Sequence, residues 1–141
     1  MGLNCACGKI SRCVAEIHAR VLVIDDEPLV RWSIVAGLRH AGIAAFAAAD
    51  LEEARRLAHL PPDLTLLDLR LWGTDPRKLL DDVRGIAPDA RILILAVEGQ
   101  ELPLSAWNDV DVIRKPFDLD QVVRRVQEAL TCPPHDVRMA V

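Results

Sequence analysis

The chain has 141 residues, of which 51% are hydrophobic, and its formal net charge is −4 at pH 7. This length and apolar content suit one compact domain with its own core, and the negative charge excludes the broad basic surface of a nucleic-acid-binding protein. No apolar stretch approaches the roughly 20 residues that cross a bilayer, and residues 1–20 lack the apolar centre of a secretory signal, so we expect a cytoplasmic protein without a membrane anchor.

Three segments are expected along the chain. Residues 1–19 form a flexible N-terminal extension, residues 20–131 one domain and residues 132–141 a C-terminal tail. All four cysteines lie in the extension and the tail, where a cytoplasmic chain keeps them reduced. The spacing C-x-C-x5-C-x4-H in the extension matches no common zinc site, so we assign no metal there.

The domain opens with a strand, a helix and a second strand. RVLVID over residues 20–25 is a short apolar run rich in β-branched residues, which predicts a buried strand. Residues 27–42 carry apolar side chains at helical spacing; Pro28 suits the first helical turn, and Gly42 suits the stop just past the end. IAAFAAA over residues 43–49 predicts the second strand.

The same alternation continues to the end of the domain. Asp50, Asp75 and Asp118 each precede a segment of helical spacing and predict the N-terminal ends of three more helices. Pro103 interrupts the crossover over residues 98–108, where we expect a short or distorted helix. The third, fourth and fifth strands are predicted over residues 63–69, 90–97 and 109–115.

Alternating strands and helices are typical of an α/β fold with a parallel sheet covered by helices on both faces. Strands buried on both faces have continuous apolar runs, as the predicted strands do. We therefore expect a doubly wound, five-stranded parallel sheet. In the strand order 2-1-3-4-5, which is common for such sheets, the first and third strands are neighbours.

Charged residues stand where three of the predicted strands end. Asp25 and Asp26 end the first strand, Asp68 ends the third and Lys115 ends the fifth. Ligands of open parallel sheets bind beyond the carboxyl ends of the strands, at the point where the strand order reverses. We therefore expect the three carboxylates to converge on one spot, with the lysine beside them.

Such a convergence needs positive charge. Two like charges about 4 Å apart repel by about 4 kcal/mol at an effective dielectric constant of about 20. Lys115 offsets one charge, and a hard divalent cation with oxygen ligands, most simply Mg²⁺, offsets the rest. The sequence thus predicts an acidic pocket suited to phosphoryl chemistry, although each residue alone also has a structural explanation, such as helix capping by Asp26.

Three motifs resemble the receiver domain of two-component response regulators. They are VLVIDDEP with Asp25 and Asp26, PDLTLLDLRL with Asp68, and IRKPF with Lys115, and the likeness runs over about residues 20–131. The resemblance implies a flavodoxin-like (βα)5 fold with the strand order 2-1-3-4-5. It also implies a role in phosphorelay signal transduction.

The resemblance further implies residue roles. Asp68 is expected to accept a phosphoryl group from a histidine kinase or phosphotransfer protein, and Lys115 to pair with the phosphate. The peptide between Lys115 and Pro116 is expected to be cis. The implied Mg²⁺ ligands are Asp25, Asp26, Asp68 and the backbone carbonyl of Arg70.

Two positions depart from the receiver pattern. Ala96 stands where the fourth strand of a receiver ends in Thr or Ser, and Val112 where the fifth strand carries Tyr or Phe. Ala96 cannot donate a hydrogen bond to a phosphoryl group, a loss of about 1.5–3 kcal/mol, which is comparable to the ~1–3 kcal/mol of a typical switch. Phosphorylation is still compatible with these residues. The usual coupling between a hydroxyl at the end of the fourth strand and an aromatic ring in the fifth is not possible, so we expect an altered output surface.

Three functions compete. The first is a single-domain receiver that is phosphorylated on Asp68 and signals through contacts with an unknown downstream protein, with no enzymatic activity beyond self-phosphorylation and self-dephosphorylation. The second is a pseudo-receiver that binds partners without phosphorylation, which Ala96 and Val112 favour. A phosphohydrolase of the haloacid-dehalogenase type ranks last, because Arg70 stands where that class needs a second aspartate. The first, fourth and fifth helices offer candidate dimer surfaces.

Overall fold

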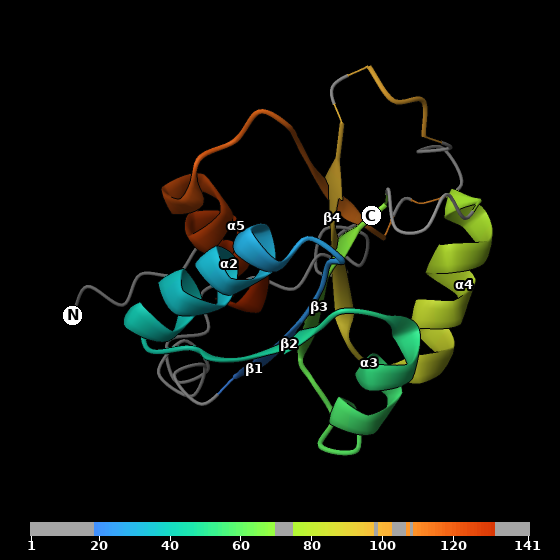
Figure 1. Cartoon of the computed structure of the whole chain (residues 1–141), viewed down its shortest axis with the longest axis horizontal. Helices are drawn as coiled ribbons and strands as arrows, with labels where there is room; N and C mark the ends of the chain where they lie inside the picture. The colour runs from blue at the N-terminus through green and yellow to red at the C-terminus, as the bar shows by residue number, and fades with distance from the viewer. Residues whose placement is uncertain (1–18, 70–74, 98, 103–106, 108, 132–141) are drawn as a thin grey trace, which may run out of the picture.

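Five parallel strands form one sheet in the order β2-β1-β3-β4-β5 (Figure 1). The computed structural model describes residues 19–69, 75–97, 99–102, 107 and 109–131. The strands are β1 (Arg20–Ile24), β2 (Ala44–Ala48), β3 (Leu64–Asp68), β4 (Arg91–Ala96) and β5 (Asp111–Arg114). The expected doubly wound sheet and its strand order are therefore confirmed.

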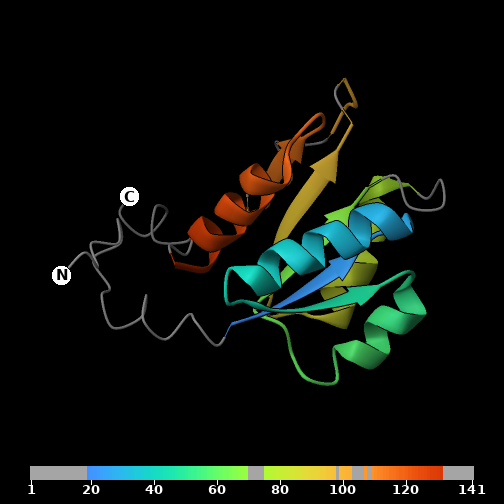
Figure 2. The same cartoon turned by 60° about the vertical axis from the view of Figure 1, so that its left-hand side comes forward.

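Helices cover both faces of the sheet. The described residues contain α2 (Pro28–His40), α3 (Leu51–Leu57), α4 (Pro76–Ile86) and α5 (Leu119–Thr131). Helices α2 and α5 lie side by side on one face, and α3 and α4 lie on the other (Figure 1 and Figure 2). None of these helices combines the length and apolar character that a bilayer-spanning segment requires.

The sheet separates two apolar clusters, because successive strand residues point to opposite faces. In β1, Val21 and Val23 join the cluster beneath α2 and α5, whereas Leu22 and Ile24 join the cluster beneath α3 and α4. Every residue of β3 is buried. Burial on both faces explains why the predicted strands had continuous apolar runs.

Local signals in the sequence set most helix ends. Pro28 is the first residue of α2, and Gly42 lies beyond its last turn with a φ of 87°, in the left-handed region that favours glycine. The Asp50 side chain accepts a hydrogen bond from the Glu53 amide at 2.8 Å, and the Glu53 carboxylate accepts one from the Ala49 amide. This reciprocal cap fixes the start of α3.

The connection between β4 and β5 was expected to hold a short or distorted helix. Residues 98, 103–106 and 108 of that stretch lie outside the described residues, and the remaining ones between β4 and β5 form no helix. Trp107 is buried there against the cluster beneath α3 and α4. The predicted extension before residue 19, the tail and Arg70 also lie outside the described part.

Candidate functional site

The three acidic residues predicted for the site lie together at the carboxyl end of the sheet. One carboxylate oxygen from each of Asp25, Asp26 and Asp68 lies within 4.8 Å of the other two. Strands β1 and β3 are paired in parallel with Ile24 opposite Leu67, so the residues that follow these positions emerge side by side. The strand order thus brings together side chains that are more than forty positions apart in the chain.

A lysine lies next to this acidic cluster. The Lys115 ammonium is 3.8 Å from Oδ2 of Asp68 and is itself partly buried. The Lys115 amide donates to the Ala96 carbonyl at 2.7 Å, which anchors the lysine at the ends of β4 and β5. The peptide between Lys115 and Pro116 is cis, as the resemblance implies.

The members of the acidic cluster differ in exposure. Asp25 and Asp68 are 0% and 1% exposed, whereas Asp26 is exposed to solvent. The cluster thus combines two carboxylates shielded from water with one that faces it. Burying a carboxylate is costly unless it is paired, so the two shielded groups carry that cost. Access to the site is therefore from the side of Asp26.

Asp25 is held by three hydrogen bonds. Its amide donates to the Ala48 carbonyl at 3.1 Å, and its Oδ1 accepts from the Glu27 amide at 2.9 Å. Its backbone carbonyl accepts from Nη1 of Arg31 at 2.8 Å. The remaining carboxylate oxygen, Oδ2, is buried and has no hydrogen-bond partner within the described part of the chain.

The surroundings of Asp25 raise its pKa from 3.8 to about 6. Burial is the largest cause and repulsion from Asp68 adds to it, whereas the hydrogen bond from Glu27 and the charge of Lys115 lower the pKa. At neutral pH the Asp25 carboxylate is therefore ionised against an opposing free energy. A cation bound at Oδ2 would remove this opposition.

The residues present fit a hard divalent cation. One carboxylate oxygen from each of three residues converges on one spot, and Oδ2 of Asp25 is buried with no hydrogen-bond partner among the residues that the structure describes. Mg²⁺ is bound in proteins through one or two carboxylates and retains several waters, so a cluster with one exposed member suits it. The fourth predicted ligand, the carbonyl of Arg70, lies outside the described residues.

The two atypical positions carry no polar side chain near the acidic cluster. Ala96 is fully buried at the end of β4, and Val112 is partly buried in β5 against the same apolar cluster. The turn that follows Ala96 is instead held by Arg114, whose Nη1 donates to the carbonyls of Gln100 at 2.8 Å and of Val97 at 3.3 Å. A side chain of β5 thus fixes the backbone next to the site.

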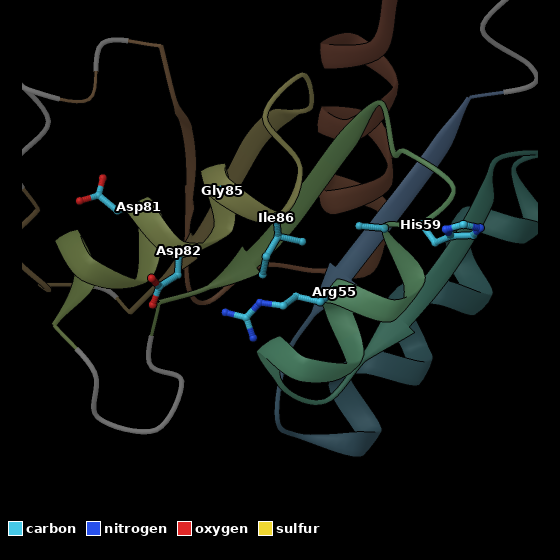
Figure 3. A pocket seen from close by; sticks show the side chains of 7 residues that line it. Arg55, His59, Asp81, Asp82, Gly85 and Ile86 are labelled. Atoms are coloured by element: carbon cyan, nitrogen blue, oxygen red, sulfur yellow. The ribbon is translucent and has the colours of Figure 1, made fainter.

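A separate hollow of about 520 Å³ lies between α3 and α4 (Figure 3). In Figure 3 the Arg55 side chain extends from α3 toward α4, where Asp82 lies. Among the described residues, none of those predicted for the site lines this hollow. Its lining residues are Arg55, Ala58, His59, Asp81, Asp82, Gly85 and Ile86.

Two residues near the site were not singled out from the sequence. Arg31 bonds the backbone of Asp25, and Arg114 bonds the turn after β4. Both donate to backbone carbonyls, so no pattern of side-chain types signals them. Only the path of the chain in three dimensions brings donor and acceptor together.

The chain is similar to known signalling proteins. The family model of the response regulator receiver domain matches residues 21–127. The DNA-binding transcriptional regulator NtrC of Escherichia coli K12 is 31% identical over 117 residues, which cover 79% of this chain and 24% of NtrC. The probable transcriptional regulatory protein TcrX of Mycobacterium tuberculosis is 33% identical over 115 residues, which cover 78% of this chain and 49% of TcrX. The chain thus spans about a quarter to a half of these relatives.

Solved structures show the same similarity. The receiver domain of NtrX from Brucella abortus is 29% identical, with a TM-score of 0.69 over 79% of this chain and 98% of that domain. The receiver domain of the hybrid histidine kinase CckA is also 29% identical, with a TM-score of 0.64 over 79% of this chain and 99% of that domain. Their common fold agrees with the sheet order found here.

Proposed function

The chain belongs to the family of response regulator receiver domains, and from this premise we propose that it is a cytoplasmic phosphoacceptor. A histidine kinase or phosphotransfer protein donates a phosphoryl group to Asp68 in a Mg²⁺-dependent reaction, and the chain then signals by contacting a downstream protein. It turns over no other substrate beyond its own phosphorylation and dephosphorylation. The observation that carries this proposal is the gathering of three carboxylates and one lysine at the carboxyl end of the sheet.

Asp68 has the surroundings that a phosphoryl acceptor needs. In the transfer, a carboxylate oxygen of Asp68 forms a bond to phosphorus while the bond between phosphorus and the donor's histidine nitrogen breaks, and that nitrogen leaves with the electron pair. The Lys115 ammonium, 3.8 Å from Asp68, can pair with the charge on the incoming phosphoryl oxygens. The product is an acyl phosphate, whose lability suits a reversible signal.

The acidic partners of Asp68 support the metal dependence. Mg²⁺ supplies charge neutralisation and a template for the phosphoryl oxygens when it is bound. Asp25 and Asp26 would hold it with Asp68. Oδ2 of Asp25, which has no hydrogen-bond partner in the described part of the chain, is the oxygen best placed to gain from a cation. Exposed Asp26 leaves the site open to the donor.

A pseudo-receiver is the second candidate, and Ala96 is the observation that favours it. Fully buried and without a hydroxyl, Ala96 offers a phosphoryl group no hydrogen bond. Arg114 meanwhile holds the adjacent turn through Val97 and Gln100. In this alternative the domain binds its partner in one fixed conformation, whether or not Asp68 is phosphorylated.

Intact mass after incubation with Mg²⁺ and acetyl phosphate tests the proposal. We expect the gain of one phosphoryl group, which is lost with EDTA and in Asp68→Asn. Asp89→Asn is the matched control, because Asp89 is an exposed carboxylate remote from the cluster and its substitution should leave the gain unchanged. A folded wild-type chain that gains no mass would favour the pseudo-receiver, and repeated turnover of a phosphate ester would favour a phosphohydrolase.

A further inference from the structure

The peptide unit between Asp25 and Asp26 joins two of the three carboxylates of the cluster. A peptide unit is planar, so the direction of the Asp25 carbonyl oxygen fixes the orientation of the whole unit. Nη1 of Arg31 donates to that oxygen at 2.8 Å, from the first turns of α2. The contact therefore controls the angle at which Asp26 leaves β1.

Asp26 depends on this contact more than Asp25 does. The Asp25 side chain is buried and accepts from the Glu27 amide, so its own position is fixed locally. The Asp26 carboxylate is exposed, and within the described residues no hydrogen bond or ion pair holds it. The backbone that carries Asp26 is thus the main restraint on where its carboxylate lies.

We propose that Arg31 is a positioning residue of the divalent-cation site, which sets the site's affinity by orienting the peptide unit between Asp25 and Asp26. This inference rests on the cation site of the proposed function and assigns a role to a residue that binds neither cation nor phosphate. Groups that hold metal ligands in place commonly contribute 10- to 100-fold to metal affinity. We expect an effect of about that size here.

The charge of Arg31 gives the proposal a sharp test. A guanidinium close to a cation site repels the cation, so electrostatics alone predicts that removing Arg31 tightens binding. Loss of orientation predicts the opposite, because the Asp26 carboxylate then samples positions away from the site. The sign of the change therefore separates the two effects.

Arg39 provides a matched control on the same helix. It also donates to a backbone carbonyl, through Nε and Nη2 to Ala45 at 3.0 and 2.8 Å. Arg39 lies in the last turn of α2, at the end opposite to Asp25. Arg31→Gln and Arg39→Gln thus remove the same charge and the same kind of bond from one helix, but only the first bond touches the cluster.

The experiment measures the Mg²⁺ dissociation constant of the full chain by calorimetric titration. We expect Arg31→Gln to weaken binding by about 10- to 100-fold, Arg31→Lys to fall between Arg31→Gln and the wild type because it keeps a donor, and Arg39→Gln to bind as the wild type does. Binding in Arg31→Gln that equals or exceeds that of the wild type would overturn the proposal. Equal losses in the Arg31 and Arg39 variants would overturn it too.

Two further readouts separate folding and phosphorylation from positioning. Unfolding midpoints in EDTA should fall at least as much in Arg39→Gln, which loses two hydrogen bonds to one carbonyl, as in Arg31→Gln, which loses one, so lost stability alone cannot make Arg31→Gln the weaker Mg²⁺ binder. If Arg31→Gln does not fold, Arg31→Lys carries the comparison. Mg²⁺ binding needs no phosphoryl donor, so a chain that binds Mg²⁺ in an Arg31-dependent way but is never phosphorylated upholds this inference and refutes the phosphoacceptor function. A wild-type chain that binds no Mg²⁺ overturns the inference itself.

Discussion

Replacing Asp25 by Asn should stabilise the metal-free protein at neutral pH. The Asp25 carboxylate is buried beside Asp68, and its Oδ2 has no hydrogen-bond partner within the described residues. The asparagine keeps an oxygen that can accept from the Glu27 amide, as Oδ1 does now. Its amide nitrogen can face Asp68 as a donor, so repulsion is replaced by attraction.

The pKa of Asp25 sets the size of the effect. A folded-state pKa of about 6 against 3.8 corresponds to at most about 3 kcal/mol, at about 1.4 kcal/mol for each pH unit. Solvent near the open side of the cluster reduces this value, and we expect Asp25→Asn to raise the free energy of unfolding by about 1–3 kcal/mol. For a domain of this size the midpoint should rise by at least about 3 °C.

The pH dependence provides the internal check. A carboxyl whose pKa is raised in the folded state binds its proton more tightly there. The free energy of unfolding of the wild type therefore carries no penalty from Asp25 below about pH 4, and it falls as the pH rises from there through about 6. The advantage of Asp25→Asn should therefore be full above about pH 7 and vanish below about pH 4.

Thermal unfolding in EDTA, followed by circular dichroism at several pH values, measures this difference. Asp26→Asn is the control, because Asp26 is exposed and its substitution should change stability little. The reasoning is refuted if Asp25→Asn is no more stable than the wild type at neutral pH, or if its advantage is the same at every pH.

Three further outcomes are expected. The Mg²⁺ affinity of the wild type should fall as the pH is lowered through about 6, because protonation of Asp25 removes a charged ligand. Calorimetric titration at two pH values measures this change, and an affinity that is the same at both would contradict it. Gly42→Ala should lower the free energy of unfolding by about 1 kcal/mol or more, since a residue with a side chain is strained at a φ of 87°. Chemical denaturation measures this loss, and an unchanged free energy of unfolding would refute the strain. Leu38→Ala should lower the free energy of unfolding by about 2–5 kcal/mol, because Leu38 is fully buried and its removal leaves a cavity beneath α2. A loss below about 1 kcal/mol in the same denaturation assay would contradict this, since it would mean that the surrounding side chains fill the space without penalty.

Local patterns in the sequence were sufficient for the elements and the fold class. Continuous apolar runs predicted the five strands because helices cover both faces of the sheet. Caps such as Asp50 act over three or four residues, so the start of α3 follows from its own neighbourhood. The crossover between β4 and β5 carried no comparable signal, since Pro103 breaks its periodicity.

The composition of the candidate site also follows from the sequence, given one strand order. Asp68 is the last residue of β3, Asp25 and Asp26 follow β1, and Lys115 follows β5. Parallel strands place their carboxyl ends on one edge of the sheet. The order β2-β1-β3-β4-β5 then makes β1 and β3 neighbours. Residue types and their places along the strands were enough to predict that these groups meet.

The tertiary structure alone decided how these groups differ from one another. Burial of Asp25 and exposure of Asp26 depend on how the helices close over the end of the sheet, and adjacent positions in the chain do not reveal it. The bonds from Arg31 and Arg114 end on backbone carbonyls, which every residue has, so no residue type marks the acceptor. The sequence by itself thus determined which groups gather at this edge of the sheet, while desolvation and backbone contacts, which arise only from packing, decided the pKa of Asp25 and the restraints on its neighbours.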